Sequence, residues 1–148
     1  MAFKLRCQGN SPLNQRYPER KKLYPSEDKF FEENTHVGGM AAEDNKVIIN
    51  PWSPLSDEQK DYVRINETSR LWMRNMEESE RPHMRIRRSQ KKLFSTIQNG
   101  KPYSDDPQDI RETIIARVIT GDASAGKITR KQRKYAERLQ SKIESDTL

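Results

Sequence analysis

Residues 121–127 read GDASAGK and match the first seven positions of a phosphate-binding loop, which has two glycines separated by four residues and then a lysine. The next position of such a loop needs a Ser or Thr hydroxyl to hold magnesium, but Ile128 stands there and Thr129 comes one position late. A phosphate loop also follows a strand, whereas helical periodicity precedes Gly121. We therefore interpret these residues as a connection between two helices.

Other residue types that support catalysis or metal binding are sparse. The histidines, His36 and His83, are far apart in sequence, and Cys7 is the single cysteine, so no zinc-ligand spacing occurs. The acidic group at residues 105–109 surrounds Pro107, which is typical of a helix start. No serine or cysteine has the surroundings of an activated nucleophile. We expect a protein that is not an enzyme and that uses no metal and no cofactor.

Positive charge is concentrated in two stretches. Residues 81–92 hold six cations and no acid, and residues 127–142 hold seven cations and one acid. Because the whole chain has a net charge of +6, the rest of it carries −6. Two basic stretches in an otherwise acidic chain favour contact with a polyanion, and arginine matches phosphate geometry. An acidic protein partner, or simply solvated helix faces, are the alternatives. The candidate nucleic-acid-binding residues are Arg81, Arg85, Arg87, Arg88, Lys91, Lys92, Arg130, Lys131, Arg133, Lys134 and Arg138.

The first basic stretch lies among predicted helices of residues 56–99. Ser56 followed by Gln59 forms a capping-box pattern, which predicts a helix that starts there and ends by Pro82. Apolar residues of this helix, Tyr62 among them, recur at helical spacing, which predicts that they face the core. A shorter helix is predicted after Pro82, with a shared apolar face and an Asn-Gly stop. The apolar face consists of Ile86, Leu93, Phe94 and Ile97.

Two further helices are predicted towards the C-terminal end. Asp106 and Pro107 are good first residues for a helix that Gly121 ends, although its β-branched residues leave a strand at 113–119 as an alternative. Thr129 and Gln132 form a second capping-box pattern before the basic helix of residues 129–144. Its apolar stripe is narrow and consists of Tyr135, Leu139 and Ile143.

Residues 1–55 do not have the pattern of a domain. Prolines punctuate the stretch, and only residues 47–49 resemble a strand. A disordered tail is one interpretation. An extended arm is the other, because disordered tails are poor in aromatic residues whereas this stretch has several that could anchor it on another protein. The candidate partner-binding residues are Phe3, Tyr17, Tyr24, Phe30, Phe31 and Trp52.

Composition limits how much of the 148-residue chain forms a core. Apolar residues make up 32% and charged residues 34%, against roughly 45–50% and 25% in a typical globular domain. We therefore predict a mainly α fold: a small bundle of three to four helices in residues 56–148, with a long extended N-terminal arm in residues 1–55. No apolar run approaches the ~20 residues of a membrane helix, and no secretory leader is evident, so we expect no membrane contact and no secretion.

Two stretches resemble small proteins of unknown function in tailed bacteriophages. They are residues 41–74, AAEDNKVIINPWSPLSDEQKDYVRINETSRLWMR, and residues 109–129, DIRETIIARVITGDASAGKIT. The resemblance covers roughly a third of the chain and implies no catalytic residue. It implies a virion or assembly component in the virion or host cytoplasm, which would dock on larger structural proteins through its arm. The alternative is a small basic accessory protein that contacts DNA or RNA phosphates, and a homo-oligomer is possible in either case.

Overall fold

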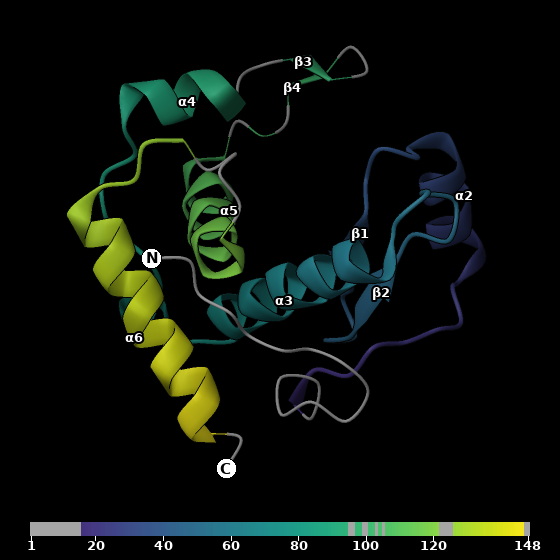
Figure 1. The fold of residues 1–148 in the computed structure, drawn as a ribbon, viewed down its shortest axis with the longest axis horizontal. Coiled ribbons are helices and arrows are strands. Elements are labelled where there is room, and N and C mark those ends of the chain that lie inside the picture. The colour runs from purple at the N-terminus through teal and green to yellow at the C-terminus, as the bar shows by residue number, and fades with distance from the viewer. Residues whose placement is uncertain are drawn as a thin grey trace.

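The chain is mainly helical in its computed structural model, as predicted (Figure 1). The structure describes residues 16–94, 97–98, 101–102, 104, 106–121 and 126–146. Its helices are α2 (Pro25–Glu33), α3 (Asp57–Arg74), a short 3₁₀ helix (Glu78–Glu80), α4 (Arg88–Phe94), α5 (Pro107–Thr120) and α6 (Arg130–Asp146). Its strands are β1 (Gly39–Ala41), β2 (Val47–Ile49), β3 (Ile97–Gln98) and β4 (Lys101–Pro102), which form two antiparallel pairs. None of the helices within these residues is long and apolar enough to cross a bilayer.

Local capping sets where the main helices begin and end. The Ser56 hydroxyl accepts a hydrogen bond from the backbone N–H of Gln59 at 3.2 Å, and the Gln59 side chain accepts one from Ser56 N–H at 2.8 Å. The Asp106 carboxylate caps α5 by accepting from Gln108 N–H at 3.0 Å. Gly121 ends α5 with φ of 75°, a left-handed conformation that glycine adopts without steric cost. These predictions are confirmed, and the alternative strand at 113–119 is wrong.

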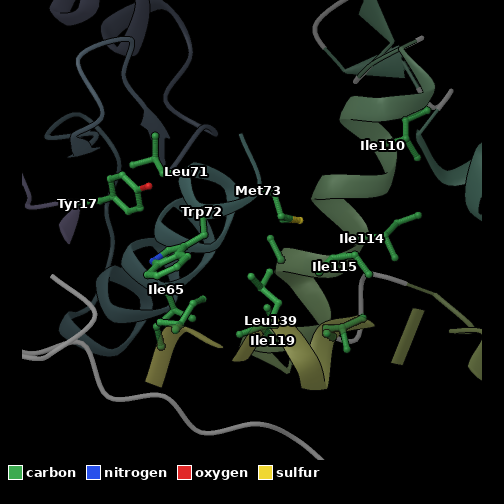
Figure 2. Packing of buried hydrophobic residues seen from close by; sticks show 14 of the residues in the cluster. Tyr17, Ile65, Leu71, Trp72, Met73, Ile110, Ile114, Ile115, Ile119 and Leu139 are labelled. Atoms are coloured by element: carbon green, nitrogen blue, oxygen red, sulfur yellow. The ribbon is translucent and has the colours of Figure 1, made fainter. Parts of the chain in front are cut away.

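Helix α5 is the centre of the main apolar core and packs against both α3 and α6 (Figure 1). Figure 2 shows Ile115 and Ile119 of α5 close to Leu139 of α6, with Met73 of α3 beside them. These side chains are at most 2% exposed. Apolar residues from three helices therefore exclude water together, which none of the helices could do alone.

Two residues with core-like spacing lie on the surface instead. Tyr62 is 47% exposed and donates a hydrogen bond to the Glu58 carboxylate at 3.1 Å. Leu93 is 49% exposed, because its neighbour Phe94, at 2% exposed, occupies the side of α4 that faces the core. The predicted C-terminal end of this short helix is also wrong, since α4 stops at Phe94 and Ile97 pairs with Pro102 in an antiparallel bridge.

The N-terminal segment contains regular structure where an extended arm was predicted. Residues 25–33 are helical, and strands β1 and β2 form a hairpin in which Met40 lies opposite Ile48. Gly39 is required in β1, because a Cβ there would come within 2.5 Å of the Ile48 carbonyl oxygen. The prediction of an extended chain is therefore wrong within residues 16–55. Residues 1–15 lie outside the described part, and an arm there stays a prediction.

Two of the predicted anchor residues are buried inside the protein. Phe31 is 0% exposed and forms a small cluster with Ala42 and Ile48. Tyr17 is 6% exposed and meets Trp72 of α3 edge to face, with ring centroids 6.0 Å apart (Figure 2). Their aromatic surface is thus used for folding, and the prediction that they dock on another protein is wrong. Phe3 lies outside the described residues.

Candidate nucleic-acid interface

A pair of glutamines joins the two basic stretches. Gln90 and Gln132 are buried, and each side-chain amide donates to the other's carbonyl oxygen, at 2.8 and 2.9 Å. Gln132 also accepts from Thr129 N–H at 3.0 Å and completes the predicted capping box of α6. Gln90 accepts from Arg87 N–H at 2.9 Å in the same way at the start of α4. The amide pair therefore holds the two basic helix starts side by side.

Next to this junction, an open groove of about 1130 Å³ runs between α6 and the chain that follows α3. Met76, Met84 and Leu139 contribute apolar surface to it, and Tyr135 adds an aromatic ring. Its charged lining consists of Arg81, Lys131, Lys134, Arg138 and Lys142, with the acids Glu80 and Glu137. Cations thus outnumber acids by five to two along the groove.

Four of these cations form a row along α6. Lys131, Lys134, Arg138 and Lys142 are three, four and four residues apart, which places about one cation on the same side of each helical turn. All four are exposed. Since a helical turn rises about 5.4 Å, the row spans roughly 16 Å and offers several contacts in register along an extended polyanion.

Hydrogen bonds to α5 and α6 fix the opposite wall of the groove. The Gln108 side chain donates to the Pro82 carbonyl at 3.3 Å, and Arg111 donates to the Met84 carbonyl at 2.9 Å. The Tyr135 hydroxyl donates to the Glu80 carbonyl at 2.7 Å. The wall is therefore held in place although it has no long helix or strand.

Burial and neighbouring acids keep Tyr135 neutral. Desolvation, together with the nearby Glu112 and Glu80 carboxylates, raises the pKa of Tyr135 to about 12. Burial likewise raises the pKa of Glu112 above its usual value, against the opposing effect of Arg81. Tyr135 therefore stays a hydrogen-bond donor across the physiological range and holds the groove wall rather than exchanging protons.

The structure brings some predicted nucleic-acid residues together and separates others. Arg81 lies in the groove with three of the predicted residues of α6. Arg85 and the basic residues of α4 do not line the groove. The Gln90–Gln132 bond connects α4 to α6, several residues of which line it. The separated group comprises Arg85, Arg87, Arg88, Lys91 and Lys92 on the α4 side, and Arg130 and Arg133 on another face of α6.

Three groove residues with a basic or aromatic side chain, which could contact phosphates or stack against a nucleic acid, were absent from the predicted set: His83, Tyr135 and Lys142. His83 and Tyr135 face the groove, and Lys142 pairs with Glu80 at 3.2 Å. The four-residue spacing of Lys134, Arg138 and Lys142 is a signal that would have identified Lys142. Nothing in the local sequence around His83 signals the groove.

The remaining predicted anchors, Tyr24, Phe30 and Trp52, are between 42% and 52% exposed. They do not form one patch. The Trp52 indole N–H donates to Asp28 at 3.0 Å, and Asp28 is two residues from Phe30 on α2, so these rings lie on different sides of that helix. The Arg20 guanidinium covers the Tyr24 ring at 4.2 Å.

The segment that resembles a phosphate loop connects α5 to α6, and residues 122–125 of it lie outside the described part. Its described neighbour Ile128 packs against the main core. Among the residues that the structure describes, no three His, Cys, Asp or Glu side chains gather as a metal site would require.

Comparison of the chain with protein-family models, with curated proteins and with solved structures finds no match.

Proposed function

We propose that this protein binds the phosphate backbone of DNA or RNA through its groove and α6, without reading sequence and without catalysis. The carrying observation is the row of four cations on α6, which faces Arg81 across the groove. Backbone phosphates are bound mainly by lysine and arginine, and such contacts carry no sequence information. Exposed aromatic side chains that could stack bases are sparse in the groove, which favours backbone contact over base contact.

Fluorescence anisotropy with labelled single-stranded and duplex oligonucleotides of mixed sequence tests the proposal. We expect binding that weakens steeply as salt rises from about 50 to about 200 mM, because bound phosphates release counterions. The variant Lys131→Gln/Lys134→Gln/Arg138→Gln should reduce the salt slope by about 0.7–0.9 for each lost contact and the affinity by more than about tenfold.

The matched control removes the same charge elsewhere. Lys21→Gln/Lys22→Gln/Lys29→Gln changes three exposed lysines near α2, outside the groove. We expect its affinity and salt slope to stay near those of the unchanged protein. Equal loss in both variants would show a general net-charge effect, and undetectable binding at low salt would end the proposal.

A second candidate function is an assembly role, in which the protein docks on larger structural proteins of a phage particle. The observation that favours it is Trp52, which is 45% exposed although its ring is held by the bond to Asp28. Fixed, exposed tryptophans are typical centres of protein interfaces. Trp52→Ala should reduce incorporation of the tagged protein into nuclease-treated particles, whereas Tyr62→Ala, which removes an aromatic ring of similar exposure on α3, should not. Unchanged incorporation of Trp52→Ala would contradict this role.

A further inference from the structure

The molecule has an acidic end and a basic end. Residues 16–61, which cover the chain before α2, α2 itself, the β1–β2 hairpin and the start of α3, hold ten acids and seven lysines and arginines, a net charge of −3. We call them the acidic end. Figure 1 shows α2 and the hairpin at one extreme of the long axis and α4 and α6 at the other, with α3 between them. A chain with opposite charges at its two ends attracts a second copy of itself end to end.

The groove also has a specific chemical character beyond its charge. Met76 and Met84 are partly buried against the core and leave part of their surface towards the groove, beside the cations of α6. Methionine adapts its shape and makes favourable contacts with aromatic rings. The segment that fits such a groove is a helix with an aromatic side chain flanked by acids.

Helix α2 has this pattern on its exposed side. Phe30 is 42% exposed, and Glu33, three residues further on, shares its face of the helix. Glu32 is also exposed, on another side of the helix. An aromatic ring with a carboxylate beside it, on a short acidic helix, is thus complementary to the methionines and cations of the groove.

We propose that copies of this chain associate head to tail, with α2 of one copy seated in the groove of the next. The two surfaces lie at opposite ends of the molecule (Figure 1), so one chain cannot bring its own α2 into its own groove. Contacts between two different surfaces of identical subunits produce rings when the rotation closes and filaments when it does not. The association does not depend on nucleic acid, although the two would compete for the same cations.

Charge reversal in two complementary variants tests this. The α2-reversed variant is Glu32→Lys/Glu33→Lys, and the groove-reversed variant is Lys134→Glu/Arg138→Glu. Sedimentation velocity of nuclease-treated protein at low salt should show species larger than one chain for the unchanged protein. Each variant alone should sediment as a monomer, because its two surfaces then carry the same sign. An equimolar mixture should regain the larger species, because each variant then offers the surface that the other lacks.

A second set of variants tests the aromatic contact. Phe30→Ala should weaken the association at unchanged charge, whereas Tyr62→Ala, an exposed ring on α3, should leave it unchanged. Thermal melting of each variant confirms that its fold is retained. A monomeric unchanged protein at all concentrations would overturn the proposal. The proposal would also be overturned if either charge variant alone still assembled, or if the mixture of the two stayed monomeric. It would likewise be overturned if the larger species disappeared with nuclease.

The same variants separate this proposal from nucleic-acid binding. The α2-reversed variant should lose self-association and keep its affinity for oligonucleotides, because its groove is intact. The groove-reversed variant should lose both. If the unchanged protein binds oligonucleotides but never associates, the head-to-tail proposal fails alone; if it associates but binds no oligonucleotide, the nucleic-acid proposal fails alone.

Discussion

The acidic end and the α5 core are held together by different interactions. Helix α5 buries six apolar residues, namely Ile110, Ile114, Ile115, Ala116, Val118 and Ile119. The acidic end has its own apolar cluster of Phe31, Ala42 and Ile48 and depends more on polar contacts. Its hairpin also touches the main core through Val47. The α5 core is thus stabilised mainly by the exclusion of water, and the acidic end mainly by the placement of a few polar groups.

Two residues, Asn50 and Arg20, each make several of these polar contacts. The buried Asn50 amide lies 2.7 Å from the Val37 carbonyl oxygen and 3.3 Å from those of Phe31 and Asn34, and donates to them. Arg20 makes a two-pronged ion pair with Glu27 at 2.9 and 2.8 Å and a third contact with Asp44 at 2.9 Å. Arg20 lowers the pKa of Glu27 below its usual value. This region therefore depends on specific donors and on pH.

The largest expected effect is in the α5 core. Ile115→Ala should lower the free energy of unfolding by about 2–5 kcal/mol, because the side chain is 0% exposed and its removal leaves a cavity. Urea denaturation measures the change. Hydrogen exchange should show that α3, α5 and α6 lose protection together. Loss of protection in α5 alone would contradict a single core shared by the three helices.

A smaller and more local effect is expected from Asn50→Ala. The change leaves buried carbonyl groups without a donor and should cost about 1–3 kcal/mol. Hydrogen exchange should increase in residues 25–49 while α5 stays protected, because the acidic end contributes little to the α5 core. If protection were lost uniformly across the chain, the acidic end and the α5 core would unfold as one unit rather than separately.

At the junction of α4 and α6, the two glutamines should behave as a unit. Gln90→Leu alone leaves the buried Gln132 amide without its partner and should cost about 1–2 kcal/mol. Gln132→Leu also removes the cap on Thr129 N–H, so the double variant should still be destabilised, but by less than the sum of the two single losses. A double-mutant cycle measured by denaturation gives the coupling. Additive losses would mean that the amides do not act as a pair.

The smallest effects concern two carboxylates with opposite pKa shifts. The Glu27 pKa is lowered, so its pairing stabilises the fold above its ordinary pKa of about 4.5 and is lost as pH falls below that value. Glu27→Gln should therefore reduce the melting temperature at neutral pH, and the reduction should shrink on acidification. Melting scans against pH measure this, with Glu32→Gln, an exposed acid on the same helix, as the control.

Burial raises the pKa of Glu67 on α3, despite the nearby Arg70 and Arg74. Its ionisation therefore opposes folding, so stability falls as pH rises above about 4.5 and through the higher pKa of the folded protein. Glu67→Gln should raise the melting temperature at neutral pH, with the gain shrinking towards pH 4.5. A lower melting temperature at neutral pH would show that the arginines outweigh the cost of burial.

The helices were more predictable than the groove. Capping residues act on backbone groups two or three positions away, so Ser56, Asp106 and Thr129 mark helix starts by local chemistry alone. The row on α6 also follows from spacing, although Lys142 was missed. The opposite wall, which carries Arg81 and His83, was not predictable. Its backbone carbonyls are held by hydrogen bonds from side chains of α5 and α6, which lie far along the chain.

By itself, the sequence determined the mainly helical class, the ends of α5 and the start of α6, and the concentration of charge in two stretches. These features depend on residues within about one helical turn of each other. The tertiary structure decided that Tyr17 and Phe31 are buried, that Tyr62 and Leu93 are exposed, and that the two basic stretches meet at Gln90 and Gln132. Those outcomes depend on which apolar surfaces pack together although they are tens of residues apart in sequence, and no local sequence pattern specifies that packing.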